Sequence, residues 1–253
     1  MARILLLGGH GKVALEMTKL LAARKHIVTS VIRNPDHAEE IRSLGDAQFI
    51  KPLVASIEDT DEESAKKLMD GIDWIIWSAG AGGKGGAERT KAVDEIAAKR
   101  FISAALAAPS VTKYLTVSAN CARKKPASYW TPEDIKAFDG AWAAIPAYCE
   151  AKANADEFLW TESRKTKKSS WQDICLRPGT LSDDPAIGKI DLGKAKQYGT
   201  ITRADVAVTA VELLERSEGE LNAAGLWIDM IQGDEPVVNA VERVLKEKIT
   251  SRE

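Results

Sequence analysis

The chain has 253 residues, of which 45% are hydrophobic, which is enough to bury the core of one large α/β domain. Its net charge of −2 gives no electrostatic basis for binding nucleic acid or an anionic membrane surface. The three cysteines include no CxxC pair, which argues against a disulfide framework and a zinc site. We therefore expect reduced thiols, no metal and a cytoplasmic location.

The first residues, MARILLLGG, lack the length and the cleavage pattern of a signal peptide. No apolar stretch approaches the ~18 residues that a membrane-spanning helix needs. We therefore expect no membrane partner.

Short apolar runs alternate along the chain with longer stretches of helical periodicity. The runs that predict strands are residues 3–7, 27–32, 47–54, 73–80, 113–119, 171–179 and 225–231. The stretches that predict helices are residues 12–21, 36–44, 62–69, 90–107, 146–163, 203–216 and 236–248. Strands joined by crossover helices form a parallel sheet, so the pattern predicts a Rossmann-type, doubly wound α/β fold.

We expect a single domain over residues 1–253, because neither a linker nor an internal repeat divides the chain. Segment 120–140 is polar and aromatic and shows no regular periodicity, and a Gly/Asp-rich stretch follows the sixth strand. These parts, about 120–140 and 180–253, are expected to form a small C-terminal substrate-binding lobe.

A glycine-rich turn, Gly8–Ala14, directly follows the first strand and matches G-x-G-x-x-A. Gly8 permits the sharp exit from the strand, and Gly9 and Gly11 let the backbone approach a pyrophosphate closely. The helix that begins near Lys12 directs its free N–H groups toward that phosphate. The turn therefore predicts a dinucleotide site, with an ordinary strand-to-helix turn as the alternative.

Arg33 stands at the end of the second strand, where NAD-specific folds place an acidic residue for the ribose 2′-hydroxyl. A guanidinium suits a 2′-phosphate and also stacks on adenine. This position therefore favours NADP(H) over NAD(H), unless Arg33 is only a solvated loop residue.

Tyr148 and Lys152 form a Y-x-x-x-K pair, whose i, i+4 spacing puts both side chains on one helix face. A lysine beside a phenol lowers the pKa of the tyrosine, which can then exchange a proton with a carbonyl oxygen. Ser118, at the end of the fifth strand, is placed to donate a hydrogen bond to the same oxygen. The alternative is a surface pair without a catalytic role.

Together, these motifs resemble the short-chain dehydrogenase/reductase superfamily, and in particular its atypical, NmrA-like NAD(P)-binding branch. The resemblance covers nearly the whole chain and also rests on SAGAGGKGG at 78–86, LRPGTL at 176–181 and TRADVA at 202–207. The sequence departs from classical members in having Ser78-Ala79-Gly80 where many carry N-A-G, and in a longer separation of Ser118 from Tyr148.

The resemblance implies a role for each matching position. The pyrophosphate would be lined by Gly8, Gly9, His10, Gly11, Lys12 and Val13, and Arg33 would hold the 2′-phosphate. The implied catalytic residues are Ser118, Tyr148 and Lys152, of which Lys152 would also bind the nicotinamide ribose. Ser78, Ala79 and Gly80 would leave room for the ribose, Pro178 would pack against the nicotinamide, and Asp205 would anchor a helix.

Three functions fit this pattern. The first is an NADP(H)-dependent oxidoreductase that transfers hydride to or from a carbonyl- or quinone-like small molecule. The second is a non-catalytic NAD(P)H-sensing protein that binds a protein partner, and the third is an epimerase that holds NAD tightly. Tyr129, Trp130 and Trp142 would either pack a surface loop or form a wall for a flat substrate. A monomer and a homodimer remain equally compatible with the sequence.

Overall fold

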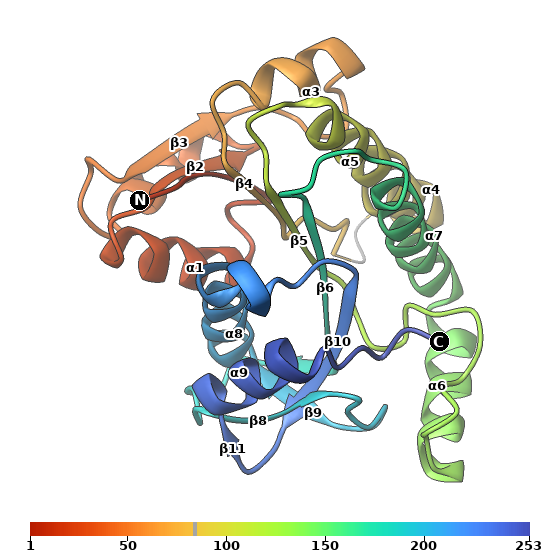
Figure 1. Ribbon diagram of the computed structural model, residues 1–253. Helices are drawn as coiled ribbons and strands as arrows, with labels where there is room; N and C mark the ends of the chain where they lie inside the picture. Colours follow the sequence, from red (N-terminus) through yellow and green to blue (C-terminus); the bar gives the residue numbers. More distant parts are fainter. Residues whose placement is uncertain (83–84) are drawn as a thin grey trace.

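A nine-stranded sheet forms the middle of the computed structural model, which describes residues 1–82 and 85–253 (Figure 1). In spatial order its strands are β11 (Glu235–Pro236), β8 (Lys189–Gly193), β10 (Leu226–Gln232), β6 (Gln172–Pro178), β5 (Lys113–Val117), β4 (Trp74–Trp77), β1 (Arg3–Leu7), β2 (Ile27–Ile32) and β3 (Ile50–Val54).

The seven strands from β3 to β10 pair in parallel, and at one edge β8 pairs antiparallel with both β10 and β11. Strand order reverses between β1 and β4, which is the switch point where doubly wound sheets bind ligands. The predicted Rossmann-type fold is therefore confirmed. Pro52 is accommodated within β3 because this strand lies at the edge of the sheet.

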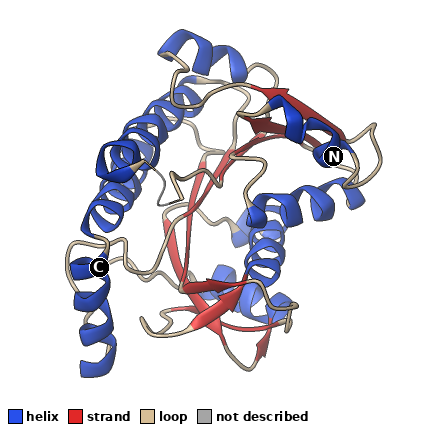
Figure 2. Cartoon of the chain, turned by 180° about the vertical axis from the view of Figure 1, so that it is seen from behind, coloured by secondary structure: helices blue, strands red, loops and turns tan. Residues whose placement is uncertain are grey.

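Helices cover both faces of the sheet (Figures 1 and 2). One face carries α1 (Lys12–Ala23), α8 (Arg203–Arg216) and α9 (Val237–Glu247). The other carries α3 (Glu62–Leu68), α5 (Ala98–Ala107) and α7 (Pro146–Ser163). In the part of the chain that the structure describes, no helix combines the length and the apolar character needed to cross a membrane.

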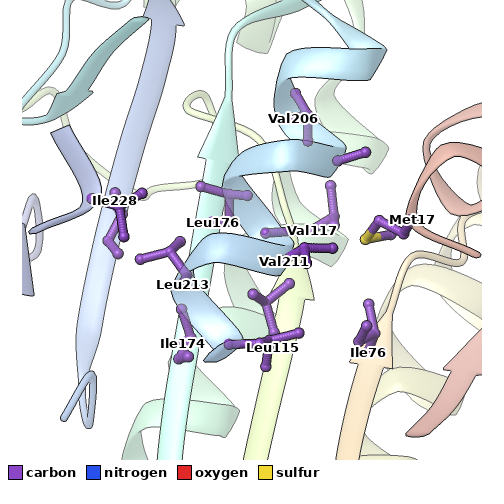
Figure 3. Packing of buried hydrophobic residues seen from close by; sticks show 14 of the residues in the cluster. Met17, Ile76, Leu115, Val117, Ile174, Leu176, Val206, Val211, Leu213 and Ile228 are labelled. Atoms are coloured by element: carbon purple, nitrogen blue, oxygen red, sulfur yellow. The ribbon is translucent and has the colours of Figure 1, made fainter. Parts of the chain in front are cut away.

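The core on the α1 and α8 face explains why the strand sequences are continuously apolar. Leu115 and Leu176 project from neighbouring strands against α8, where Val211 and Leu213 are fully buried (Figure 3). Tyr114 and Ile75 belong to a second buried cluster on the opposite face. A strand whose two faces are both covered by helices has no position where a polar side chain can reach water.

Segment 120–140 is not wholly irregular, which corrects the prediction for this region. Helix α6 spans Pro132–Ala144 and begins with a capping box between Thr131 and Asp134. The cap is reinforced from outside, since Asp134 also accepts hydrogen bonds from the amides of Gln197 (3.0 Å) and Tyr198 (3.2 Å). The signal was a T-P-E-D sequence, with a proline at the first helical position.

The Gly/Asp-rich stretch after the sixth strand also contains regular structure. It holds β7 (Thr180–Ser182), β8 and β9 (Thr200–Thr202), and β7 and β9 form a small parallel sheet. Asp205 anchors this region to α8, because its carboxylate accepts hydrogen bonds from the amides of Ile187 and Gly188 (both 2.9 Å). These contacts confirm the structural role that was predicted for Asp205.

Two of the predicted helices are divided into shorter helical segments. The predicted helix 90–107 consists of α4 (Gly86–Thr90), a π-helical turn η2 (Lys91–Ala97) and α5. The predicted helix 36–44 is a 3₁₀ turn η1 (Pro35–His37) followed by the short α2 (Ala38–Arg42). A second 3₁₀ turn, η3 (Gly219–Leu221), precedes β10.

Candidate cofactor and active site

A cleft of about 300 Å³ opens at the carboxyl ends of β1, β2 and β4. Seven of the predicted cofactor residues line it, namely Gly8, His10, Gly11, Arg33, Ser78, Ala79 and Gly80. The remaining lining residues are Val31, Ile32, Asn34, His37, Ala55, Ile57, Glu58, Arg89 and Val93. The cleft therefore lies at the switch point of the sheet, where a dinucleotide is expected.

Gly8 is required by both its conformation and its surroundings. Its φ is +84°, and a Cβ at this position would lie 2.6 Å from the Cα of Ala79. Gly11 is also close to backbone, since its Cβ would lie 3.2 Å from the carbonyl oxygen of Gly8. These two positions keep the floor of the cleft free of side chains.

Gly9 has a different reason to be glycine than the one predicted. It is buried, its amide donates to the carbonyl of Val31 at 2.8 Å, and a Cβ would lie 2.9 Å from the Ser30 side chain. Gly9 thus fastens the turn to β2 instead of lining the cleft.

The N-terminus of α1 faces this turn. Its N-cap is Gly11, and no side chain caps the first turn of the helix, so its leading N–H groups can serve an anion. Lys12 is exposed and forms an ion pair with Asp183, which in turn pairs with Arg203 at 2.7 Å. The Val13 side chain points into the core, so only its backbone is suited to a phosphate.

Two arginines share one carboxylate at the end of the cleft beside β2. Glu58 accepts hydrogen bonds from Arg33 (2.9 Å) and from Arg89 (2.6 Å). Hydrogen bonding from Arg89, together with the charges of both arginines, lowers the pKa of Glu58, so its carboxylate stays ionised. This rim carries a net charge of one positive unit from these three groups. Neither Glu58 nor Arg89 was singled out from the sequence.

His10 is held in place by ring stacking and a carboxylate. Its ring stacks on that of His37 with a centroid distance of 3.4 Å, and its Nε2 lies 2.7 Å from Glu40. Both rings line the cleft, which gives it a flat aromatic wall beside the phosphate turn.

The end of β4 is tied to the π-helical turn by Asp94, a residue that the sequence reading missed. The buried Asp94 carboxylate accepts the amide of Ala81 at 2.9 Å, and a Cβ on Gly80 would lie 2.9 Å from its Oδ1. Small residues after β4 therefore make room for the Asp94 carboxylate. Gly83 and Lys84 of the predicted glycine-rich loop lie outside the described residues.

Lys152 contacts both Asp94 and the backbone at the carboxyl ends of β4 and β5. Its Nζ lies 3.3 Å from Asp94 Oδ1 and donates to the carbonyl oxygens of Ala79 and Val117, both at 3.4 Å. Burial works to lower the pKa of Lys152, but Asp94, Tyr148 and Asp156 outweigh burial, so its pKa is raised and it stays cationic. Lys152 therefore contacts Ala79, which lines the cleft, but its own side chain lines a separate small buried cavity together with Asp94 and Asp156.

Tyr148 lies one helical turn before Lys152, whose Nζ is 5.9 Å from the centre of the phenol ring. Lys152 acts to lower the pKa of Tyr148, as predicted, but burial outweighs it and raises the pKa to about 12. The expectation of a tyrosine with a lowered pKa is therefore wrong. The Tyr148 phenol therefore keeps its proton at neutral pH.

Ser118 donates its hydroxyl hydrogen to the buried Asp156 at 2.5 Å. Asp156 also accepts a hydrogen bond from Arg177 at 2.9 Å, and Arg177 donates to Asp229 at the same distance. Burial raises the pKa of Asp156, against the opposing effects of Arg177 and Ser118. The predicted catalytic Ser118 is thus hydrogen bonded to a buried network of charged side chains. Pro178 is buried next to it on β6.

The aromatic residues after β5 serve packing. Trp130 is buried and donates its Nε1–H to the carbonyl of Ala195 at 3.1 Å, and Trp142 donates to the carbonyl of Cys121 at 3.1 Å. Tyr129 donates to Asp229 at 2.9 Å. These bonds favour the interpretation of a packed surface segment over that of a substrate wall.

A parallel sheet with a glycine turn, an uncapped helix N-terminus and a cleft at the switch point define a Rossmann-fold dinucleotide-binding protein. The chain belongs to the NAD(P)H-binding family, whose model matches residues 8–217. The resemblance inferred from the motifs is therefore confirmed at the level of the NAD(P)H-binding family.

Relatives cover nearly the full chain. UPF0659 protein C216.03 of Schizosaccharomyces pombe is 32% identical over 239 residues, which are 92% of this chain and 91% of that protein. YhfK of Bacillus subtilis, described as an uncharacterized sugar epimerase, is 26% identical over 96% of this chain and 100% of its own. The oxidoreductase ylbE from Lactococcus lactis shares the fold, with a TM-score of 0.74, 24% identity and coverage of 96% of this chain and 97% of that one.

Proposed function

We propose that the protein is an NADP(H)-dependent oxidoreductase that transfers hydride to or from a carbonyl- or quinone-like small molecule. The observation that carries this proposal is the position of Lys152 and Tyr148. Lys152 reaches the carbonyl of Ala79, which lines the dinucleotide cleft, and Tyr148 stands beside it with its proton in place.

The residues of the cleft fit a dinucleotide phosphate. Any Cβ on Gly8 would fill the space against Ala79, and the first turn of α1 offers N–H groups without a side-chain cap. Arg33 and Arg89 would hold a 2′-phosphate at the far end of the cleft, because two guanidiniums exceed the charge of Glu58. This excess of positive charge supports NADP(H) over NAD(H).

When bound, the nicotinamide supplies or accepts hydride. Side chains of the protein would donate or accept the accompanying proton. Tyr148, protonated because its pKa is about 12, would donate its phenolic proton to the substrate oxygen in the reducing direction. Lys152, fixed by Asp94, would stabilise the phenolate that is left behind. Ser118 would position the substrate oxygen after its hydroxyl turns away from Asp156.

The test is a Tyr148→Phe variant assayed with NADPH and a panel of carbonyl and quinone compounds, by following NADPH absorbance. Loss of a catalytic proton donor lowers turnover by roughly 10²–10⁴-fold, while NADPH binding stays unchanged. Tyr198→Phe is the matched control, since Tyr198 is 78% exposed. Full turnover in Tyr148→Phe with a true substrate would overturn the catalytic assignment.

Two other outcomes point to different functions. Tight NADPH binding without turnover of any compound in the panel would favour a cofactor-sensing protein. Retention of NAD through purification would favour a tightly held cofactor and an epimerase, the activity that the name of the Bacillus subtilis relative suggests. Arg33 speaks against the latter because NAD carries no 2′-phosphate.

A further inference from the structure

Cys121 and Cys149 come from distant parts of the sequence but meet beside the proposed proton donor. Cys121 lies in the turn after β5, and Cys149 lies in the first turns of α7, directly after Tyr148. Their sulfur atoms are 3.5 Å apart, with the Cys149 thiol donating to Cys121. The mechanism proposed above uses neither of them.

We propose that Cys121 and Cys149 are an oxidative modification site, a dithiol that hydrogen peroxide converts to a disulfide. A disulfide needs a sulfur–sulfur distance of about 2.05 Å, so the two thiols must approach each other by roughly 1.5 Å more. Both side chains already point at one another, so the approach needs only local adjustment of the turn that carries Cys121.

The two thiols have different roles in this reaction. Hydrogen bonding from Cys149 and the charge of Arg177 lower the pKa of Cys121, whereas the same hydrogen bond and burial raise the pKa of Cys149. Cys121 is therefore the attacking sulfur, because the thiolate is the nucleophile. Cys121 is 6% exposed and Cys149 is fully buried, so an oxidant the size of peroxide fits this site better than a bulky disulfide.

The chemistry balances in two steps. The Cys121 thiolate attacks one peroxide oxygen, so that an S–O bond forms, the O–O bond breaks, and the departing hydroxide takes up a proton as water. Cys149 then attacks the sulfenic sulfur of Cys121, so that the S–S bond forms, the S–O bond breaks, and the Cys149 proton leaves with the oxygen as a second water. The dithiol loses two electrons, and one peroxide becomes two waters.

The third cysteine supplies a matched control. Cys175 is buried on β6, and its thiol is hydrogen bonded to Asp156. Burial and Asp156 raise its pKa well above the usual range, so this thiol is unreactive. Oxidation directed by the geometry should therefore leave Cys175 reduced.

The experiment treats the intact wild-type protein with hydrogen peroxide, blocks the remaining thiols with iodoacetamide, and maps the peptides without reduction. The expected result is a cross-linked peptide pair containing Cys121 and Cys149, with Cys175 carrying the blocking group. In Cys149→Ser, dimedone should trap a sulfenic acid on Cys121, and Cys175→Ser should form the cross-link as the wild type does.

Several results would overturn the proposal. They are a cross-link to Cys175, peroxide oxidation of Cys121 in the wild type without a cross-link, and no reaction at peroxide concentrations that oxidise an exposed thiol. The wild-type peptide map decides the matter even if a variant fails to fold. Because the map records no turnover, its result is independent of the proposed oxidoreductase activity.

Discussion

Arg33 lies at the predicted place in the cleft but has an ion-pair partner that its sequence position did not indicate. Its place after the second strand predicted contact with a 2′-phosphate, and the structure puts it on the rim of the dinucleotide cleft. What the sequence did not reveal is that Glu58 binds it together with Arg89. The rim therefore combines two guanidiniums with one carboxylate, and we expect this net positive charge to influence which cofactor binds better.

Replacing Arg33 by alanine should weaken NADPH binding by about 10–100-fold, because one charge-assisted hydrogen bond is worth roughly 1.5–3 kcal/mol. NADH, which lacks the phosphate, should bind with nearly unchanged affinity. Fluorescence titration with each cofactor measures both values. Arg42→Ala is the control, since Arg42 pairs only with Glu39 on the exposed face of α2 among its described contacts. An equal loss for NADPH and NADH would contradict the assignment.

Glu58→Gln should have the opposite effect. Removing one negative charge near the 2′-phosphate strengthens NADPH binding by about 3–10-fold, as expected for charges a few ångströms apart at a solvated rim. NADH binding should change little. Asp59→Asn removes the same charge from an exposed neighbour and should have less effect. If Glu58→Gln weakened NADPH binding, Glu58 would instead be positioning the arginines.

At the scale of elements, helix α7 places the residues proposed for proton transfer on one of its faces. Tyr148, Lys152 and Asp156 recur every four residues and therefore share the face of α7 that packs on the sheet. The sequence predicted this shared face for the first two. It did not predict the electrostatics, because the acids that compensate Lys152 come from η2 and from one turn further along α7.

The junction of α7, β6 and β10 holds a carboxyl with an unusual titration. Asp173 is 3% exposed, forms an ion pair with Arg164 and accepts the amide of Gly225 at 3.1 Å. Burial outweighs these contacts and raises the pKa of Asp173 to about 6. Protonation therefore favours the folded state, since the unfolded carboxyl titrates near ~3.9.

This shift predicts a stability change with pH. The contribution of Asp173 is fully present below pH ~4 and is lost as the pH rises through ~6. Relative to Asp173→Asn, the wild-type free energy of unfolding should fall by about 3 kcal/mol across that window. Urea denaturation at several pH values measures it, with Asp139→Asn as the exposed control. A constant difference between wild type and Asp173→Asn would refute the raised pKa.

At the scale of the whole molecule, Asp229 joins segments that are far apart in sequence. Its fully buried carboxylate accepts hydrogen bonds from Arg177 (2.9 Å), Arg123 (2.7 Å), Tyr129 (2.9 Å) and Ser251 (3.0 Å). Strands β6 and β10, the turn after β5 and the C-terminal segment are thereby fixed to one point beneath the proposed active site. The chain end lies beside α6 as a result (Figure 1).

Asp229→Asn should therefore destabilise the protein by about 3–5 kcal/mol, because it leaves two buried guanidiniums with one compensating carboxylate, Asp156. Thermal or urea denaturation would register the change. Asp234→Asn, in the turn after β10, is a control of the same chemistry at an exposed position. A loss below ~1 kcal/mol would mean that the network is not a principal source of stability.

The sequence by itself determined the doubly wound, parallel class of the sheet, the phosphate turn, the helix face of Tyr148 and Lys152, and the family. These features follow from local periodicity and from residues adjacent along the chain, where spacing alone places side chains. Only the tertiary structure decided that Gly9 packs on β2, that Glu58 bridges two arginines, that Asp94 and Asp156 flank Lys152, and that Tyr148 keeps its proton. Apart from Asp156, which follows Lys152 by one turn of α7, the partners at these positions are tens of residues away along the chain. No local pattern in the sequence therefore encodes these contacts.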